Sequence, residues 1–189
     1  MSIATAPDPA KLVIGAFMAK RDLLVTVGQR LAELFGPLDL VSAWLPFDRT
    51  DYYAAEMGPN LARRLLVFKA LVDPGRLAAI KTATNAVEAD LAAGGRRRVN
   101  IDPGLLTRER FVLATGKNYS HRIYLENGIY ADLTLMYRHG DFTPLPWTYP
   151  DYAAVPMRAL LETIRKKYLQ DLKQIAPAAS GARDGEGAP

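Results

Sequence analysis

Apolar runs and apolar residues at helical spacing alternate along the first part of the chain. Residues 11–17 are mostly apolar, as in a buried strand, and residues 23–35 place apolar side chains every three or four positions until a Gly-Pro pair ends the pattern. Residues 38–47 and 65–72 are rich in Val, Leu, Phe or Trp, which predicts two more strands. The expected order is therefore strand, helix, strand, strand.

A second helix and two further strands are expected in the middle of the chain. The Asp-Pro-Gly sequence at 73–75 supplies an N-cap and a first-turn proline, and residues 77–91 then keep helical spacing up to a pair of glycines. Alternating polar and apolar residues at 98–102 predict a strand. Asp-Pro-Gly at 102–104 predicts a turn, and residues 111–115 predict another strand.

The first six of these elements have the order βαββαβ, which is typical of a ferredoxin-like core, in which two helices pack on one face of a mostly antiparallel sheet. The connection between the second and third strands, residues 48–63, is far longer than the hairpin turn that would suffice. Loops of this size in compact domains are often functional. We therefore expect residues 48–63 to contribute to a site.

Beyond residue 117 the sequence predicts a β-meander and one more helix. Asn-Gly at 127–128 is a strong signal for a two-residue hairpin turn, and His-Gly at 139–140 suits a second turn. From Met157 to Leu172 the apolar residues form one stripe along a helix. The fold class expected is α+β: a ferredoxin-like βαββαβ core extended by a C-terminal β-meander and an amphipathic helix.

The composition is that of an ordinary globular domain. The 189 residues are 49% hydrophobic and 23% charged and include no cysteine, which excludes disulfides, cysteine-based zinc sites and a cysteine nucleophile. We expect a mobile N-terminus at 1–10, a single domain at 11–175 and a disordered tail at 176–189. The apolar run at 12–19 is far shorter than the roughly 20 residues of a membrane-spanning helix. A cytoplasmic protein without membrane contact is predicted.

Positive charge is concentrated in the middle of the chain. Lys and Arg number 24 overall against 20 Asp and Glu, but residues 60–122 alone hold 12 bases and five acids. This distribution indicates a region that binds anions. If these bases form one exposed patch, they predict a surface for nucleic acid or for a protein partner.

A histidine and an aspartate on the predicted hairpin form the first candidate site. With Asn-Gly as the loop, His121 lies diagonally across from Asp132 on the same face of the sheet. A carboxylate beside a histidine can hold its tautomer and raise its basicity, as a general acid or base requires. His121 and Asp132 are therefore candidate catalytic residues, and a polar pair without a function is the alternative. Arg122 is expected on the opposite face.

Three carboxylates in the long loop form the second candidate site. Asp48, Asp51 and Glu56 could bind Mg²⁺ or another divalent cation, which prefers oxygen ligands. The alternative is that Asp48 or Thr50 caps a short helix. Tyr52, in the same segment, is expected to contact a substrate.

The basic segment and its continuation supply candidate anion-binding groups. Strand alternation places Arg98, Asn100 and Asp102 on one face, where an arginine could hold a phosphate or carboxylate. A solvated strand end is the alternative. Lys117 adds a cation four positions before His121.

The aromatic and proline-rich stretch at 144–152 is expected to be extended, because residues before prolines are disfavoured in helices. Its aromatic side chains could line a pocket or stack on a base, and Trp147 is the candidate substrate contact. The alternative is that the stretch simply covers a sheet edge or an opening in the core.

Long motifs in these four segments resemble a bacterial family known as domain of unknown function 4416. The motifs are Phe47-Asp48 with Thr50 to Tyr53 and Glu56 to Gly58, Arg96 to Gly104, His121 to Leu125 with Gly128 to Ala131, and Pro144 to Tyr152. The resemblance covers residues 11–173 and implies a bacterial, soluble, single-domain protein. Some members are labelled GTP-binding, whereas this chain lacks the P-loop motif for nucleotide phosphates.

Together these features predict a small enzyme or ligand-processing protein that acts on an anionic, phosphate-bearing or nucleotide-like small molecule. Arg98 and Lys117 would bind the anion, and His121 would act as the acid or base. The alternative is a non-catalytic module that binds nucleic acid or a partner through residues 60–122. A homodimer formed through an exposed sheet edge or the last helix is a further expectation.

Overall fold

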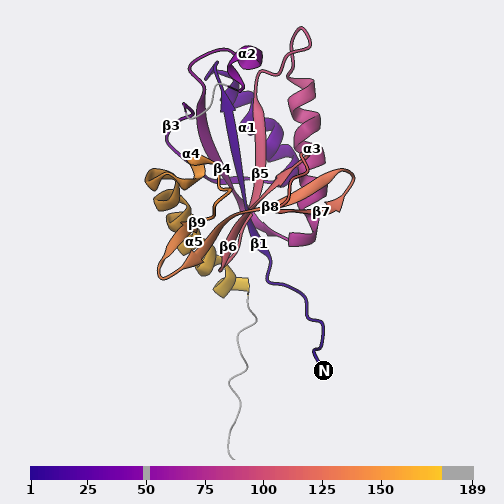
Figure 1. Cartoon of the computed structure of the whole chain (residues 1–189), viewed down its shortest axis with the longest axis vertical. Helices are drawn as coiled ribbons and strands as arrows, with labels where there is room; N and C mark the ends of the chain where they lie inside the picture. The colour runs from indigo at the N-terminus through magenta and orange to yellow at the C-terminus, as the bar shows by residue number, and fades with distance from the viewer. Residues whose placement is uncertain (49–51, 176–189) are drawn as a thin grey trace, which may run out of the picture.

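A computed structural model describes residues 1–48 and 52–175, in which helices cover both faces of a central antiparallel sheet (Figure 1). The strands are β1 (Ala10–Met18), β2 (Leu38–Val41), β3 (Leu45–Pro46), β4 (Ala62–Val72), β5 (Asn100–Leu106), β6 (Arg110–Thr115), β7 (Arg122–Glu126), β8 (Ile129–Arg138) and β9 (Asp141–Pro144). The helices are α1 (Leu23–Phe35), α2 (Ala54–Met57), the 3-10 helix η1 (Pro74–Arg76), α3 (Leu77–Asp90), α4 (Pro150–Ala153) and α5 (Val155–Ile175).

The strands form one sheet in the order β2-β4-β1-β5-β6-β8-β7, with β3 paired to β4 and β9 paired to β8. The pairings between these strands are antiparallel. Helix α1 connects β1 to β2, and α3 connects β4 to β5. Each helix therefore joins two strands that are separated by another strand in the sheet. The architecture is α+β, built on a large antiparallel sheet.

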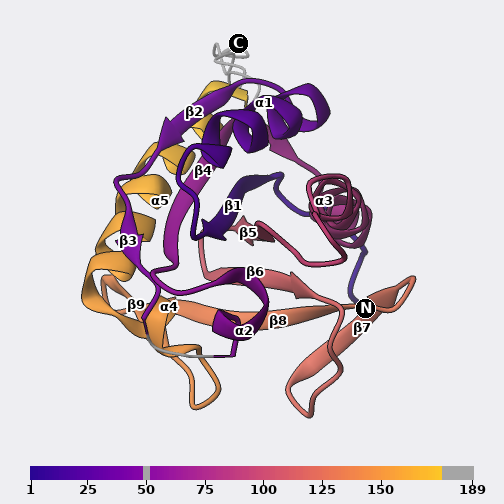
Figure 2. The same ribbon diagram turned by 90° about the horizontal axis from the view of Figure 1, so that it is seen from above.

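All nine residues of β1 are buried because both faces of this strand are covered. Leu12 and Ile14 pack into the core beneath α1 and α3, whereas Val13 belongs to the core beneath α5. Figure 2 shows α5 lying across the sheet from α3. Alternate side chains of β1 point to opposite faces of the sheet, and helices cover both faces. This is why the apolar run that predicts the strand is continuous and does not alternate with polar residues.

A fully buried lysine joins the last helix to the sheet. Lys11 is 0% exposed, forms ion pairs with Asp39 and Asp171, and donates to the carbonyl oxygens of Phe68 and Lys69 at 3.3 Å. An ammonium taken out of water needs such partners, because an uncompensated buried charge is strongly destabilising. Lys11 therefore ties the C-terminal part of α5, which carries Asp171, to β1.

The turn predicted at 102–104 is wrong, because β5 runs straight through it. Pro103 pairs with Ile14 of β1, and the pairing of β5 with β6 starts only at Gly104. The missing proline N–H is therefore not needed by β6, and a proline is tolerated here. Gly104 is required by packing, since a Cβ atom there would lie 2.6 Å from the ring of Phe111.

The first hairpin has the predicted turn but a different register. Asn127 and Gly128 both have positive φ, as this turn type requires, and so do the two residues of the second predicted turn at 139–140. Arg122, not its neighbour at 123, faces Asp132, because the pairing of β7 with β8 is irregular near the hairpin end. A shift of one residue moves each side chain to the other face.

Residues 1–9 precede the first strand. The tail predicted to be disordered, 176–189, lies outside the described residues, and β1 begins at Ala10. Asp8 forms an exposed ion pair with Arg108, at 2.9 Å. Among the helices that the structure describes, none is both long and apolar enough to cross a membrane.

We predict that Gly104→Ala destabilises the fold by about 1–3 kcal/mol, the usual cost of overpacking a core. The added methyl group would collide with the fully buried ring of Phe111. Gly116→Ala is the matched control, since a Cβ atom at Gly116 meets nothing within 4 Å. Urea denaturation of both variants measures the effect, and equal midpoints would contradict the prediction.

Candidate functional site

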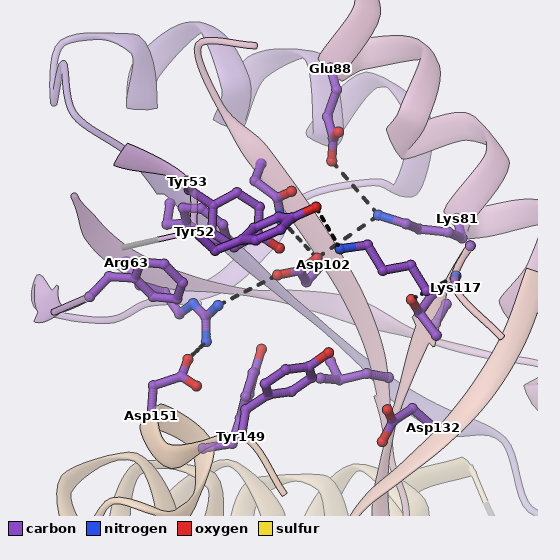
Figure 3. Close-up of a pocket in the computed structure, with 18 of the residues that line it drawn as sticks. Tyr52, Tyr53, Arg63, Lys81, Glu88, Asp102, Lys117, Asp132, Tyr149 and Asp151 are labelled. Carbon is purple, nitrogen blue, oxygen red and sulfur yellow. Dashed lines mark hydrogen bonds and ion pairs between the residues drawn. The ribbon is translucent and has the colours of Figure 1, made fainter. Parts of the chain in front are cut away.

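A cavity of about 580 Å³ opens where β5 and β6 separate (Figure 3). The two strands pair only from Gly104 to Leu106 on β5. Beyond the last pair, Asp102 on β5 and Thr115 on β6 both line the cavity. Helix α3 contributes to one wall, and α4 with the residue before it contributes to another.

The four segments singled out in the sequence all contribute to this cavity. The lining includes Phe47, Tyr52 and Tyr53 from the first segment, Arg97, Asn100 and Asp102 from the second, Lys117, Arg122 and Asp132 from the third, and Tyr149 to Tyr152 from the fourth. They come from separate parts of the chain, so the antiparallel sheet is what gathers them.

Arg63 on β4 is the most deeply buried cation of the cavity. Its guanidinium forms an ion pair with Asp151 and lies 3.5 Å from the carboxylate of Asp102, and it stacks against the rings of Phe47 and Tyr152. Burial alone would lower the pKa of Arg63, but the nearby phenol and carboxylates outweigh burial and raise the pKa. Arg63 therefore stays charged inside the fold.

Arg63 lies outside the four segments that carry the candidate residues in the sequence. The available signal was an arginine pair at the start of a strand that is otherwise apolar except for Lys69. An arginine at such a position can be buried only if carboxylates neutralise it. The carboxylates that neutralise Arg63 are those of Asp102 and Asp151, which lie far away in the sequence.

A second buried ion pair lies on the α3 side of the cavity. Lys81 donates to the carbonyl oxygen of Ile101 at 2.7 Å and lies 3.7 Å from Glu88 and 4.0 Å from Asp102. One oxygen of Glu88 accepts the Ile101 N–H at 2.6 Å. Burial is the main cause that raises the pKa of Glu88, against the opposing effect of Lys81.

Glu56 is held by Arg97 through two side-chain hydrogen bonds, of 2.9 and 2.6 Å, and by the Arg97 backbone N–H at 3.2 Å. The hydrogen bond from Arg97 lowers the pKa of Glu56. Of the other proposed metal ligands, Asp48 is exposed and Asp51 lies outside the described residues. Within residues 1–48 and 52–175, no group of three His, Asp or Glu side chains is placed to hold a metal ion.

His121 and Asp132 are in contact, with 3.2 Å between Nε2 and the carboxylate. Asp132 lines the cavity, whereas His121 does not and instead stacks on Trp147, with ring centroids 4.9 Å apart. Arg122 also donates to Asp132, at 2.9 Å. The expectation that Arg122 points to the opposite face is therefore wrong, as the shifted hairpin register requires.

Two of the proposed substrate contacts lie outside the cavity lining. Trp147 donates its indole N–H to the carbonyl oxygen of Leu133 at 2.8 Å and covers His121. Arg98 precedes β5, so the strand alternation used to place it does not extend that far. Arg97 lines the cavity in its place and donates to Asn100 at 3.0 Å.

Lys117 lies at an exposed part of the cavity. Its ammonium is 3.4 Å from the Tyr52 hydroxyl and 4.4 Å from the centre of that ring. Arg122 donates to the Lys117 carbonyl oxygen and to the Tyr149 hydroxyl, both at 2.8 Å. The other four described cations of the cavity each have a carboxylate within 4.0 Å. Lys117 has none among the described residues.

Tyr53 places a phenol hydroxyl in the electrostatic field of the inner carboxylates. Burial, followed by the charge of Asp102, raises the pKa of Tyr53 to about 12. Its ring packs edge-on against Tyr52, with centroids 4.9 Å apart. Tyr53 is therefore protonated at neutral pH and can donate a hydrogen bond.

A family model described as Domain of unknown function (DUF4416) matches residues 8–168. The chain belongs to this family. The described residues that line the cavity all fall within the matched range, so the cavity lies in the part of the chain that matches the family. No match is found among curated proteins, and none among solved structures.

We predict that Glu88→Gln becomes progressively more stable relative to the wild type as pH rises through and above the ordinary range of a glutamate pKa. A raised pKa means that ionising Glu88 costs more in the folded than in the unfolded chain, so wild-type stability is lost as pH rises through that window. Urea unfolding at a series of pH values measures the difference in unfolding free energy.

Glu126→Gln, which removes an exposed carboxyl on β7, is the control for this experiment. A stability difference between Glu88→Gln and the wild type that does not change with pH would contradict the assignment of Glu88 as a carboxyl destabilised by burial.

Proposed function

We propose that the protein binds and acts on an anionic small molecule that carries a phosphate group or resembles a nucleotide. The observation that carries this proposal is the cavity, whose volume of about 580 Å³ is typical of a small-molecule site. Charged groups are rarely buried together in a protein without a structural or functional reason. Here they surround a space large enough for a ligand.

The charge around the cavity favours an anion at its exposed part. Among the described residues, five cations and four carboxylates line it, and four of these cations are paired with carboxylates. Lys117 interacts with a tyrosine instead, so its charge is available to a phosphate. Arg122, held against the Lys117 backbone, adds positive charge at the same place.

In this proposal, Asp132 is the member of the candidate catalytic pair that contacts the ligand. His121 acts as a positioning residue, because it reaches the cavity only through Asp132. Arg97 and Tyr53 take the substrate-binding roles first expected of Arg98 and Trp147. A divalent metal is not part of the proposal, since Glu56 is already bound by Arg97.

We also propose that strands β1, β2, β4 and β5 form a ferredoxin-like core. The order β2-β4-β1-β5 and the connections through α1 and α3 support this assignment, because they follow the βαββαβ arrangement with antiparallel neighbours. Strands β6 to β9 would then be an extension, and the cavity would lie at the junction between core and extension.

Nucleic-acid or partner binding through residues 60–122 receives less support. Arg63 and Lys81 are buried, and Arg97, Lys117 and Arg122 line the cavity. The bases of this segment are therefore divided between the interior and the surface, whereas backbone recognition of nucleic acid uses exposed charge. Homodimer formation and a cytoplasmic location stay predictions.

We predict that Lys117→Ala weakens binding of a phosphate-bearing ligand by about tenfold to a hundredfold, because a hydrogen bond to a charged group contributes about 1.5–3 kcal/mol. Calorimetric titration with ribose phosphate and adenosine monophosphate measures the dissociation constants. Lys173→Ala removes an exposed lysine near the end of α5 and is the control. Wild-type protein that binds neither probe, or binding that Lys117→Ala leaves unchanged, would argue against the proposal.

A further inference from the structure

We infer that the ligand of the cavity is a sugar phosphate, either free or as the sugar-phosphate part of a nucleotide. Its phosphate would lie at Lys117, and its hydroxyl groups would bind the inner polar groups of Asp102, Asn100 and Tyr53. The inference rests on the proposed function, because it names the class of anion that the same cavity accepts.

The two parts of the cavity differ in chemistry. Around the outer end, the described lining residues place two cations, Lys117 and Arg122, beside one carboxylate, Asp132, which Arg122 holds at 2.9 Å. Further inside, Asp102 and Asp151 both contact the single guanidinium of Arg63. A phosphate is attracted to the first part and repelled by the carboxylates of the second. An anionic ligand is therefore oriented with its charge outward and its uncharged part inward.

The inner carboxylates retain capacity to accept hydrogen bonds. Asp102 receives an N–H from Asn100 at 2.8 Å and lies 3.5 Å from Arg63, and its side chain is 26% exposed. A carboxylate has about four acceptor sites, more than these contacts occupy. Hydroxyl groups are the donors that suit this position, since they bring no extra charge beside the neighbouring cations Arg63 and Lys81.

Aromatic rings flank the same space. Tyr52 and Tyr53 pack together along one wall, and Tyr149 lies near Asp132 along another (Figure 3). The Tyr53 hydroxyl is protonated and can donate to a sugar oxygen. Aromatic rings beside the inner carboxylates and the Asn100 amide suit a sugar. A sugar has hydroxyl groups around its rim, which can bind the polar groups, and C–H groups on its faces, which can pack on the rings.

Titrating the wild-type protein with three probes of similar charge tests this inference. Ribose phosphate is expected to bind at least about tenfold tighter than butyl phosphate, which lacks hydroxyl groups, because a tenfold difference corresponds to roughly one net hydrogen bond. Adenosine monophosphate distinguishes a nucleotide ligand from a free sugar phosphate. Tighter binding than ribose phosphate indicates a nucleotide, and equal or weaker binding indicates a free sugar phosphate.

Two variants locate the hydroxyl groups. Asp102→Asn and Tyr53→Phe are each expected to weaken binding of ribose phosphate several-fold more than binding of butyl phosphate. Asp22→Asn, at an exposed position before α1, is the matched control for the aspartate change and should alter neither affinity. If Asp102→Asn does not fold, Tyr53→Phe alone decides the test, because it removes only a hydroxyl group.

The outcomes separate this inference from the proposed function. Butyl phosphate that binds as tightly as ribose phosphate would overturn the sugar assignment while leaving a phosphate site in place. Equal losses for both probes in Tyr53→Phe would also overturn it. Absence of binding by all three probes would overturn the proposed function and this inference together.

Discussion

The guanidinium of Arg63 is buried, so carboxylates must lie beside it to neutralise its charge. Much of the arrangement of the site follows from this constraint. Arg63 sits on β4, while its partners Asp102 and Asp151 come from β5 and from the first turn of α4. A charge removed from water and left without a partner would be strongly destabilising. The same contacts that neutralise Arg63 therefore hold α4 against the sheet and place two carboxylates at the cavity.

The cavity exists because β5 and β6 pair over only part of their length. The ring of Phe111 packs against Gly104 at the point where the strands begin to separate. Polar side chains occupy the opened region, and α3 supplies Lys81 and Glu88 to one wall. Most of these charges are satisfied by one another, so the side chains of the cavity are held in place by contacts within the protein.

Several chemical roles could be located from the sequence only to within a segment. The candidate residues lie in four segments of the sequence, and each segment supplies residues to the cavity. Within those segments, the residue that lines the cavity is in some cases the neighbour of the predicted residue, and in one case the partner that lies in front of it. Arg97 replaces Arg98 because β5 begins later than the alternating pattern suggests. Arg122 joins Asp132 because the hairpin is irregular, and His121 lies behind Asp132.

Local patterns in the sequence by themselves determined the elements. The apolar run of β1, the stripe on α5 and the turn at Asn127 reflect backbone preferences and periodicity within short stretches. Only the tertiary structure decided the strand registers, the continuation of β5 through Pro103 and the burial of Arg63. These features depend on contacts between residues far apart in the chain, where a one-residue shift changes which face a side chain occupies. The sequence therefore determined which segments supply polar residues to the cavity, and packing decided which side chains face it.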